Sequence, residues 1–309
     1  MKQFIYTTFG GLCAVAVGIG ITYGGIYIWS SIRSGNLTAM ISSSVDGTSV
    51  SGFTRQVRYS ASQEENLIDN ANWNASRNSS TISAKSYIVV NEKDMLVVAS
   101  RTPDRLLPIA SLTKLVTAAV AHKYLADDAI VTISGDIIST YGNTAEFKIG
   151  ENFFAKDLLY PLLMVSSNDA AEALARTYGR KKFIEKMNEF AQSIGAYRTH
   201  FVDPSGLSPD NVSTARDFAI ILTWLNNYDH EIVSITDLKS KTARVHTWTN
   251  PAHFLNWSNY IGGKNGYTEE ANQTAAALFS MNDNRDIYTV VVLGSSARDN
   301  DMIKLLAKI

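Results

Sequence analysis

A serine and a lysine that could form a catalytic pair stand three residues apart, at Ser111 and Lys114. This spacing places both side chains on one face of a helix. A serine hydroxyl is a poor nucleophile until a base takes its proton, and a lysine that is desolvated or lies beside another cation can have its pKa lowered enough to be that base. The alternative is an ordinary helix cap followed by a solvated lysine. The pair alone has little specificity.

A second polar group, Ser166 and Asn168, follows an apolar stretch and precedes a predicted helix that begins near Asp169. In a catalytic role, Ser166 would relay a proton toward a leaving amine, while the Asn168 amide would hold the substrate backbone and the Lys114 amine. In a structural role, the same residues would form a loop that caps the helix. Both interpretations stay open at this point.

A third group consists of Lys264, Asn265 and Gly266, followed by Tyr267 and Thr268 at the start of the C-terminal strand region. Glycine in such a position lets a substrate backbone approach an edge strand, and the lysine supplies a positive charge for a carboxylate. A glycine turn with a solvated lysine would have the same sequence.

The elements that must position these groups can be predicted from hydrophobic periodicity. Residues 111–226 show apolar side chains at helical spacing, and a last helix is predicted near residues 299–308. Strand patterns occur at residues 87–90, 95–99, 274–280 and 287–293. Strands at both ends and helices between them predict an α+β domain whose terminal strands share one sheet.

Taken together, the three polar groups resemble the S-x-x-K, S-x-N and K-T-G set of penicillin-binding proteins and β-lactamases. The surrounding segments, residues 108–114, 158–171, 203–207 and 213–217, resemble the serine-type D-alanyl-D-alanine carboxypeptidases. The resemblance covers residues 86–309. It implies the fold of that family, in which an antiparallel sheet is flanked by helices and a helical lobe is inserted.

The resemblance also implies roles for individual residues. Ser111 would be the acylated nucleophile, Lys114 its general base and Ser166 the proton relay, and water would deacylate the enzyme. The backbone N–H groups of Ser111 and Tyr267 would form the oxyanion hole. The implied substrate-binding residues are Asn168, Lys264, Asn265, Gly266, Tyr267, Thr268 and Arg298.

Two of these assignments carry an alternative. The family's usual threonine between lysine and glycine is Asn265 here, so Asn265 or Thr268 would have to replace a hydroxyl contact to the substrate carboxylate. Arg298 stands where the family often has an arginine that engages this carboxylate, and its bidentate geometry suits that role. It could equally be a solvated residue that caps the last helix.

The implied activity is hydrolysis of a D-Ala-D-Ala bond in peptidoglycan stem peptides, with β-lactams as covalent inhibitors and no metal, nucleotide or other cofactor. A D,D-endopeptidase that cuts cross-links and a β-lactamase are alternative enzymes of the same kind. A cell-wall-binding protein with weak catalysis is an alternative from another class, because a fold does not guarantee a function.

Composition limits the remaining function classes. The chain has 309 residues, 45% of them apolar, and can bury a sizeable core. Its 28 basic and 29 acidic residues nearly balance, which does not favour nucleic acid as a partner. The single cysteine, Cys13, allows neither a disulfide framework nor a thiolate metal site within one chain.

The N-terminal residues differ in character from the rest. Residues 9–29 carry no charged side chain, and as a helix they would span about 31 Å, enough to cross a bilayer. We therefore expect a short cytoplasmic tip and a single transmembrane helix over residues 1–30, a Ser/Asn-rich stalk over residues 31–85 and an extracytoplasmic catalytic domain over residues 86–309. A cleaved signal peptide and a buried core helix are the alternatives for the apolar run.

Overall fold

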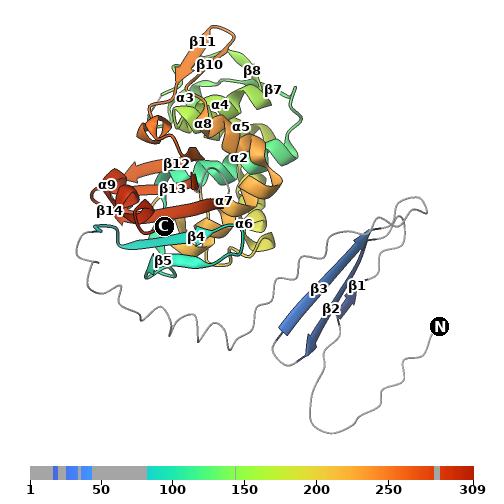
Figure 1. The fold of residues 1–309 in the computed structure, drawn as a ribbon. Coiled ribbons are helices and arrows are strands. Elements are labelled where there is room, and N and C mark those ends of the chain that lie inside the picture. The colour runs from blue at the N-terminus through green and yellow to red at the C-terminus, as the bar shows by residue number, and fades with distance from the viewer. Residues whose placement is uncertain (1–16, 20–25, 34–35, 44–81, 143, 282–285) are drawn as a thin grey trace, which may run out of the picture. The chain divides into compact units, whose positions relative to one another are not determined.

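The computed structural model describes residues 17–19, 26–33, 36–43, 82–142, 144–281 and 286–309 (Figure 1). The chain divides into two compact units, Met1–Asn78 and Ser79–Ile309. The first unit contains an antiparallel sheet of three strands in the order β1–β2–β3. These strands are β1 (Val17–Ile19), β2 (Ile26–Arg33) and β3 (Asn36–Ser43).

The transmembrane helix predicted over residues 9–29 is not supported. The described part of that run is strand, namely β1 and the beginning of β2, and its other residues lie outside the described ones. Among the helices that the structure describes, none is long and apolar enough to cross a bilayer. The physical reason is composition, because Ile26, Tyr27, Ile28 and Trp29 all favour strands, and a short apolar run does not distinguish strand from helix by periodicity.

The stalk predicted over residues 31–85 also differs from the structure where it can be compared. Its beginning forms the end of β2 and the whole of β3, whereas a coil was expected there. Residues 44–81 lie outside the described residues. Residues 82–85 belong to the second unit, where Ser83 and Ala84 both donate hydrogen bonds to the Asp301 carboxylate.

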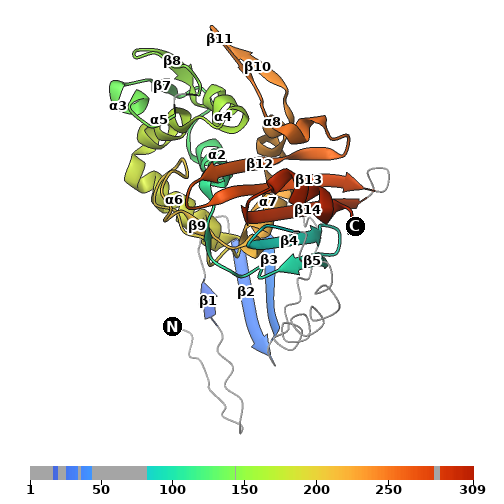
Figure 2. The ribbon, with the colours of Figure 1, turned by 90° about the vertical axis from the view of Figure 1, so that its left-hand side faces the viewer.

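The second unit is built on a five-stranded sheet in the order β12–β13–β14–β4–β5, in which every neighbouring pair is antiparallel (Figure 2). Its strands are β4 (Ser86–Asn91), β5 (Val97–Arg101), β12 (Tyr260–Thr268), β13 (Asn272–Met281) and β14 (Asp286–Ser295). The hairpin of β4 and β5 therefore pairs, through β4, with β14, the last of the described strands. This confirms the prediction that the terminal strands share one sheet.

Helices cover both faces of this sheet. Side chains alternate between the faces along a strand, so Val290 packs in one apolar cluster with Met302, while its neighbour Val291 packs in another with Phe218. Met302 belongs to α9 (Arg298–Leu306) and Phe218 to α7 (Ala215–Tyr228). The predicted arrangement of an antiparallel sheet between helices is thus confirmed.

Most of the remaining helices form a lobe inserted between β5 and β12, as expected (Figure 1). They are η3 (Ala110–Leu112), α2 (Thr113–Tyr124), α3 (Gly135–Ile138), α4 (Ala155–Met164), α5 (Asn168–Tyr178), α6 (Arg180–Ser193), α8 (His230–Asp237) and η4 (His253–Asn256). Three small strand pairs accompany them: β6 (Leu107–Pro108) with β9 (Val212–Ser213), β7 (Ile130–Thr132) with β8 (Asn152–Phe154), and β10 (Ser240–Ala243) with β11 (His246–Thr249).

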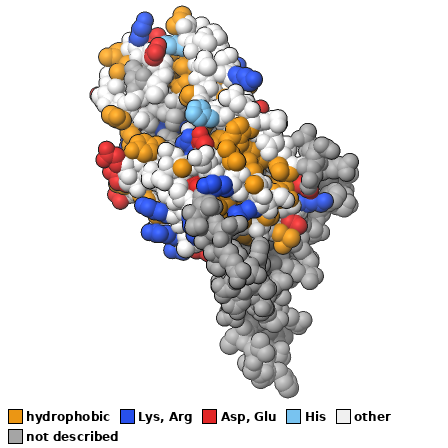
Figure 3. Space-filling view, turned by 60° about the vertical axis from the view of Figure 1, so that its left-hand side comes forward, with side chains coloured by type: hydrophobic (Ala, Val, Ile, Leu, Met, Phe, Trp, Pro, Cys, Tyr) orange, Lys and Arg blue, Asp and Glu red, His pale blue; other side chains and the backbone are white. Residues whose placement is uncertain are grey.

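Charge is mixed over the surface of the second unit. On the face drawn in Figure 3, outside the grey atoms, basic and acidic side chains occur near one another. That face shows no extended area of one sign, in line with the balanced composition of the chain.

Candidate active site

Ser111 lies in the short 3₁₀ turn η3, which leads directly into α2. Its neighbour Ala110 has a φ of 49°, in the left-handed region that residues with a Cβ rarely occupy. Two hydrogen bonds hold the preceding residue: the Ile109 N–H donates to the Asn211 carbonyl at 3.0 Å, and the Thr274 hydroxyl donates to the Ile109 carbonyl at 3.1 Å. A strained residue held by its surroundings in this way is typical of active sites.

Lys114 is fully buried beside Ser111. Its Nζ lies 3.0 Å from Ser111 Oγ and also donates a hydrogen bond to the Ser205 carbonyl. Burial, and next the positive charge of Lys264, lower its pKa well below the ordinary lysine value, while Asp203 has a smaller opposite effect. A neutral amine held in this position can direct its lone pair at the Ser111 hydroxyl, so Lys114 has the properties of a general base.

The turn that follows residue 202 supports this lysine, and sequence reasoning gave it no role. Asp203 Oδ1 accepts hydrogen bonds from Ser205 N, Ser205 Oγ and Gly206 N, and its Oδ2 accepts one from Ser208 N. Gly206, with a φ of 85°, packs so tightly that an added Cβ would lie 2.0 Å from the Ala110 carbonyl oxygen. The signal was present in the sequence, since Asp-Pro-Ser-Gly is a strong turn pattern.

Strand β12 brings the third polar group close to Ser111. A Cβ added at Gly266 would lie 2.8 Å from the Ser111 backbone nitrogen, so only glycine allows the strand this close. Lys264 is 4% exposed, and its Nζ donates to the Asn265 carbonyl at 2.8 Å. Burial, together with the charge of Arg298, lowers the pKa of Lys264 to about 7. The first and third groups therefore meet at one place.

The second group lies between α4 and α5. Ser166 is half-buried and has a φ of 58°. Its neighbour Ser167 caps α5 by accepting a hydrogen bond from Ala170 N at 3.0 Å, so the cap does not need Ser166. The Asn168 amide nitrogen donates to the Tyr141 carbonyl at 2.7 Å. Within the described residues, the predicted hydrogen bond from Asn168 to Lys114 is not found.

The remaining predicted residues lie at the end of β12 and the start of α9. Tyr267 is 62% exposed, and the Thr268 hydroxyl accepts a hydrogen bond from Ala271 N at 3.1 Å in the following turn. Arg298 is not the solvated residue of the alternative interpretation, because its side chain is only 16% exposed. Its Nε donates to Asp299 at 2.8 Å, and its guanidinium carbon lies 5.7 Å from the centre of the Phe254 ring.

The residues that the structure describes include no cluster of three histidine, cysteine or acidic side chains suited to a metal ion. The described residues bring together the Ser111 hydroxyl, Lys114 with its lowered pKa, and a second buried lysine, Lys264. This combination suits attack on a carbonyl group next to a carboxylate.

The buried carboxyl of Asp169, which follows Asn168 in the chain, has no hydrogen-bond partner among the described residues. Asp169 is 0% exposed, and burial raises its pKa to about 6 from an ordinary 3.8. The folded protein therefore holds this proton more tightly than the unfolded chain, and stability falls as pH rises from about 4 to about 6.

We expect Asp169→Asn to be more stable than the parent at pH 8, by about 1 to 3 kcal/mol, and to differ little from it at pH 3.5. Chemical denaturation at both pH values measures the difference. The exposed Asp128→Asn is the matched control and should change little at either pH. Equal stability of Asp169→Asn and the parent at pH 8 would show that Asp169 is not destabilising when ionised.

Comparison with known proteins decides which family this site belongs to. The sequence profile of the D-alanyl-D-alanine carboxypeptidase family matches residues 72–297. The chain belongs to this family. The family resemblance and the serine-peptidase class predicted from the sequence are thereby confirmed.

Relatives of this D-alanyl-D-alanine carboxypeptidase family member carry two kinds of name. A D-alanyl-D-alanine endopeptidase of Pseudomonas aeruginosa is 32% identical over 224 residues, which cover 69% of this chain and 71% of the relative. One of Escherichia coli is 34% identical over 182 residues, covering 58% of this chain and 57% of the relative. The chain therefore matches little more than half the length of some relatives.

Solved structures agree with the observed fold. A D-alanyl-D-alanine carboxypeptidase of Mycobacterium tuberculosis is 28% identical, with a TM-score of 0.67, and the match covers 73% of this chain and 90% of that one. A mutant of a Streptomyces DD-transpeptidase is also 28% identical, with a TM-score of 0.67, and the match covers 74% and 98% of the two chains. The penicillin-binding-protein type of fold is thus established for the second unit.

Proposed function

We propose that this protein is a serine D-alanyl-D-alanine carboxypeptidase that trims peptidoglycan stem peptides through an acyl-enzyme on Ser111. One observation carries the proposal: Lys114 is fully buried, has a lowered pKa and lies 3.0 Å from the Ser111 hydroxyl. A serine with a neutral amine in hydrogen-bond range is an activated nucleophile.

In the proposed reaction, Lys114 takes the Ser111 proton as Oγ attacks the carbonyl carbon of the penultimate D-alanine. The tetrahedral oxyanion would accept hydrogen bonds from the Ser111 and Tyr267 backbone N–H groups, and Gly266 keeps the strand close enough for both. Collapse of this intermediate breaks the C–N bond, and Ser166 passes the proton to the leaving D-alanine amine. Water then attacks the ester, which releases the shortened peptide and restores Ser111.

Substrate recognition would depend on the cations beside the nucleophile. Lys264 and Arg298 would attract the terminal carboxylate of D-Ala-D-Ala, and the same charges would attract the carboxylate of a β-lactam. Asn265, Thr268 and the Asn168 amide would complete the polar contacts. The Thr268 hydroxyl oxygen accepts a hydrogen bond from Ala271 N and its own O–H can still donate to a carboxylate, so Asn265 and Thr268 are both candidates to replace the family's threonine.

Intact-mass spectrometry after incubation with benzylpenicillin tests the proposal. We expect the protein mass to increase by the whole mass of the β-lactam, and peptide mapping to place the adduct on Ser111. An unmodified mass after long incubation with excess ligand would contradict the enzyme and favour a protein that only binds cell wall. Rapid turnover of the β-lactam without a trapped adduct would favour a β-lactamase.

A D,D-endopeptidase is the second candidate, because the Pseudomonas aeruginosa and Escherichia coli relatives carry that name. Both activities break a bond on the carboxyl side of a D-alanine by the same acyl-enzyme route. Purified protein given a stem pentapeptide and a cross-linked dimer separates them. Release of free D-alanine supports the carboxypeptidase, whereas conversion of dimer to monomers without free D-alanine supports the endopeptidase.

The two lysines predict a bell-shaped pH dependence of the penicillin acylation rate constant. Lys114 must be neutral to act as a base, so the rate rises with pH as it loses its proton. Lys264 must be charged to attract a carboxylate, and since its pKa is lowered to about 7, the rate should fall again above this pH. Lys264→Arg keeps the charge at all pH values, because arginine stays protonated, and should remove the alkaline fall. An alkaline fall that persists in Lys264→Arg would assign it to another group.

We also propose that the catalytic unit works outside the cytoplasmic membrane and that residues 9–29 hold the chain there. The proposed substrate lies outside that membrane, and the lack of charge over residues 9–29 supports attachment. Strands β1 and β2 give no support to a helical span. Cell fractionation tests attachment: the full chain should sediment with membranes and resist carbonate extraction, and a chain lacking residues 1–30 should not.

A further inference from the structure

The segment between α3 and β8 is fixed to Asn168 at one end. The Asn168 Nδ2 donates to the Tyr141 carbonyl at 2.7 Å, and a Cβ added at Gly142 would lie 3.2 Å from the same nitrogen. An amide group is planar, so one hydrogen bond to a fixed carbonyl sets the direction of its second N–H and of its oxygen. The position of Tyr141 therefore determines how the Asn168 amide can meet a substrate.

The same segment is also fixed to β11, at Ala145. Trp248, which is 3% exposed, donates from Nε1 to the Ala145 carbonyl at 3.2 Å. Its ring lies edge-on to Phe147 at 6.3 Å and stacks on His246 at 5.8 Å. The Thr144 N–H donates to the Gly142 carbonyl at 2.9 Å, which joins the end held by Trp248 to the end held by Asn168.

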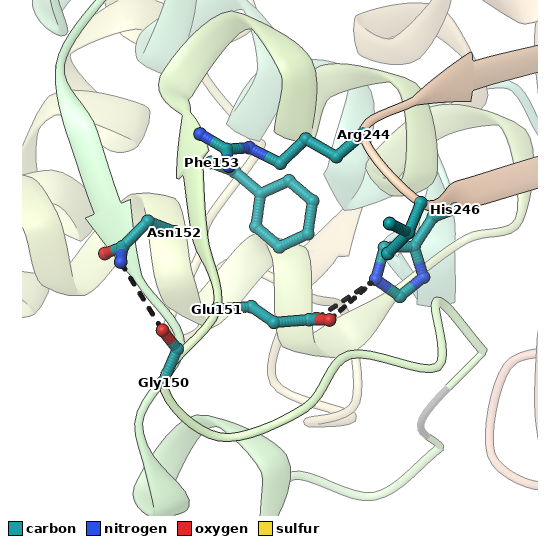
Figure 4. A pocket seen from close by; sticks show the side chains of 7 residues that line it. Gly150, Glu151, Asn152, Phe153, Arg244 and His246 are labelled. Carbon is teal, nitrogen blue, oxygen red and sulfur yellow. Dashed lines mark hydrogen bonds and ion pairs between the residues drawn. The ribbon is translucent and has the colours of Figure 1, made fainter.

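A contact between a histidine and a carboxylate strengthens the attachment to β11. His246 Nε2 lies 3.0 Å and 3.2 Å from the two carboxylate oxygens of Glu151, and both side chains are mostly buried (Figure 4). Glu151 also accepts a hydrogen bond from Lys148 N at 2.9 Å, and its carbonyl accepts one from Ile133 N at 2.8 Å. The pair thus ties the β10–β11 hairpin to Glu151, which is itself hydrogen-bonded to Lys148 and Ile133.

We propose that Trp248 and the His246–Glu151 pair are positioning residues that hold the Tyr141 carbonyl in place and thereby orient the Asn168 amide toward the substrate backbone. The inference rests on the proposed function, since it concerns the contact between Asn168 and an acyl donor. In the chain, the β10–β11 hairpin lies between α8 and β12, the strand that contains Lys264.

Trp248→Phe tests the proposal, because it keeps an aromatic ring but removes the N–H donor together with one ring of the buried indole. We expect the second-order rate constant for acylation by benzylpenicillin to fall about 10-fold, the scale of one lost hydrogen bond. The double variant with Asn168→Ala should be no slower than Asn168→Ala alone, since both changes act through one amide. Trp224→Phe, on α7 with ring contacts to Phe190 and Tyr228, is the matched control and should leave the rate unchanged.

A comparison of two ligands separates positioning from general loosening of the fold. Benzylpenicillin has a side-chain amide for Asn168, whereas 6-aminopenicillanic acid lacks it. Trp248→Phe should slow acylation by the first and leave the second almost unchanged, and Glu151→Gln should do the same. Equal slowing with both ligands, or additive effects in the double variant, would overturn the proposal.

Failure of the proposed function gives a different result. In that case the parent protein is acylated by neither ligand. Hydrogen exchange of the backbone amides of residues 144–151 then provides the test, because it needs no ligand. Exchange should be faster in Trp248→Phe than in Trp224→Phe, and unchanged exchange would overturn the inference by itself.

Discussion

Ser111→Ala is expected to abolish both covalent labelling by benzylpenicillin and release of D-alanine from a stem pentapeptide. The Ser111 oxygen forms the acyl bond in the proposed mechanism, so no covalent adduct should form without it. The free energy of unfolding should change by less than about 1 kcal/mol, because the serine is only half-buried and its hydroxyl contacts Lys114 alone among the described hydrogen bonds.

Intact-mass spectrometry and a D-alanine assay measure the two losses, and chemical denaturation measures the stability. Ser234→Ala, on α8, is a matched control, since it removes an exposed hydroxyl that bonds only within its own helix. It should be labelled at the parent's rate. An adduct that forms on Ser111→Ala would show that another residue is the nucleophile.

The sheet and the helical lobe could be predicted from the sequence because their apolar patterns are local. Residues 287–293 are apolar except for Thr289, and they form the centre of β14, buried on both faces of the sheet. The helix predicted over residues 299–308 is α9, displaced by one or two residues at its ends. A strand covered on both faces needs mostly apolar residues, and this requirement is visible without the rest of the fold.

The contact between Ser111 and Lys114 was also predictable, since the two residues are close in the chain. The other partners of Lys114 were not, because they are distant in sequence. The Ser205 carbonyl that receives the lysine N–H comes from a turn 91 residues away. Asn168 bonds to the Tyr141 carbonyl, and a backbone carbonyl leaves no mark on residue identity.

The transmembrane helix predicted over residues 9–29 is not supported where it can be compared. Residues 26–29 are apolar, as a membrane helix requires, but they are also β-branched or aromatic. Hydropathy alone does not choose between strand and helix for such residues. The structure has β2 there.

Lys114→Met is expected to slow penicillin acylation by at least about 100-fold, the usual scale for loss of a general base. Methionine has a similar length and fills the same buried space without an ionisable group. Ser111 keeps its hydroxyl and Ala110 keeps its strained backbone, so residual slow labelling should remain. Stopped-flow or gel-based measurement of the acylation rate constant checks this, and a rate near that of the parent would mean that another base is at work.

The same variant should be more stable than the parent at pH 7. The pKa of Lys114 is lowered well below 10.5 in the folded state, because burial and the nearby Lys264 disfavour the charged form. The unfolded chain therefore binds more protons between the two pKa values, and the contribution of Lys114 to stability increases as pH rises through this range. Lys114→Met lacks this contribution, so its advantage at pH 7 should shrink as pH approaches 10.5. Lys264 is present in both proteins and its effect largely cancels in the comparison, so a constant difference between pH 7 and pH 10 would show that Lys114 is not neutral in the folded protein.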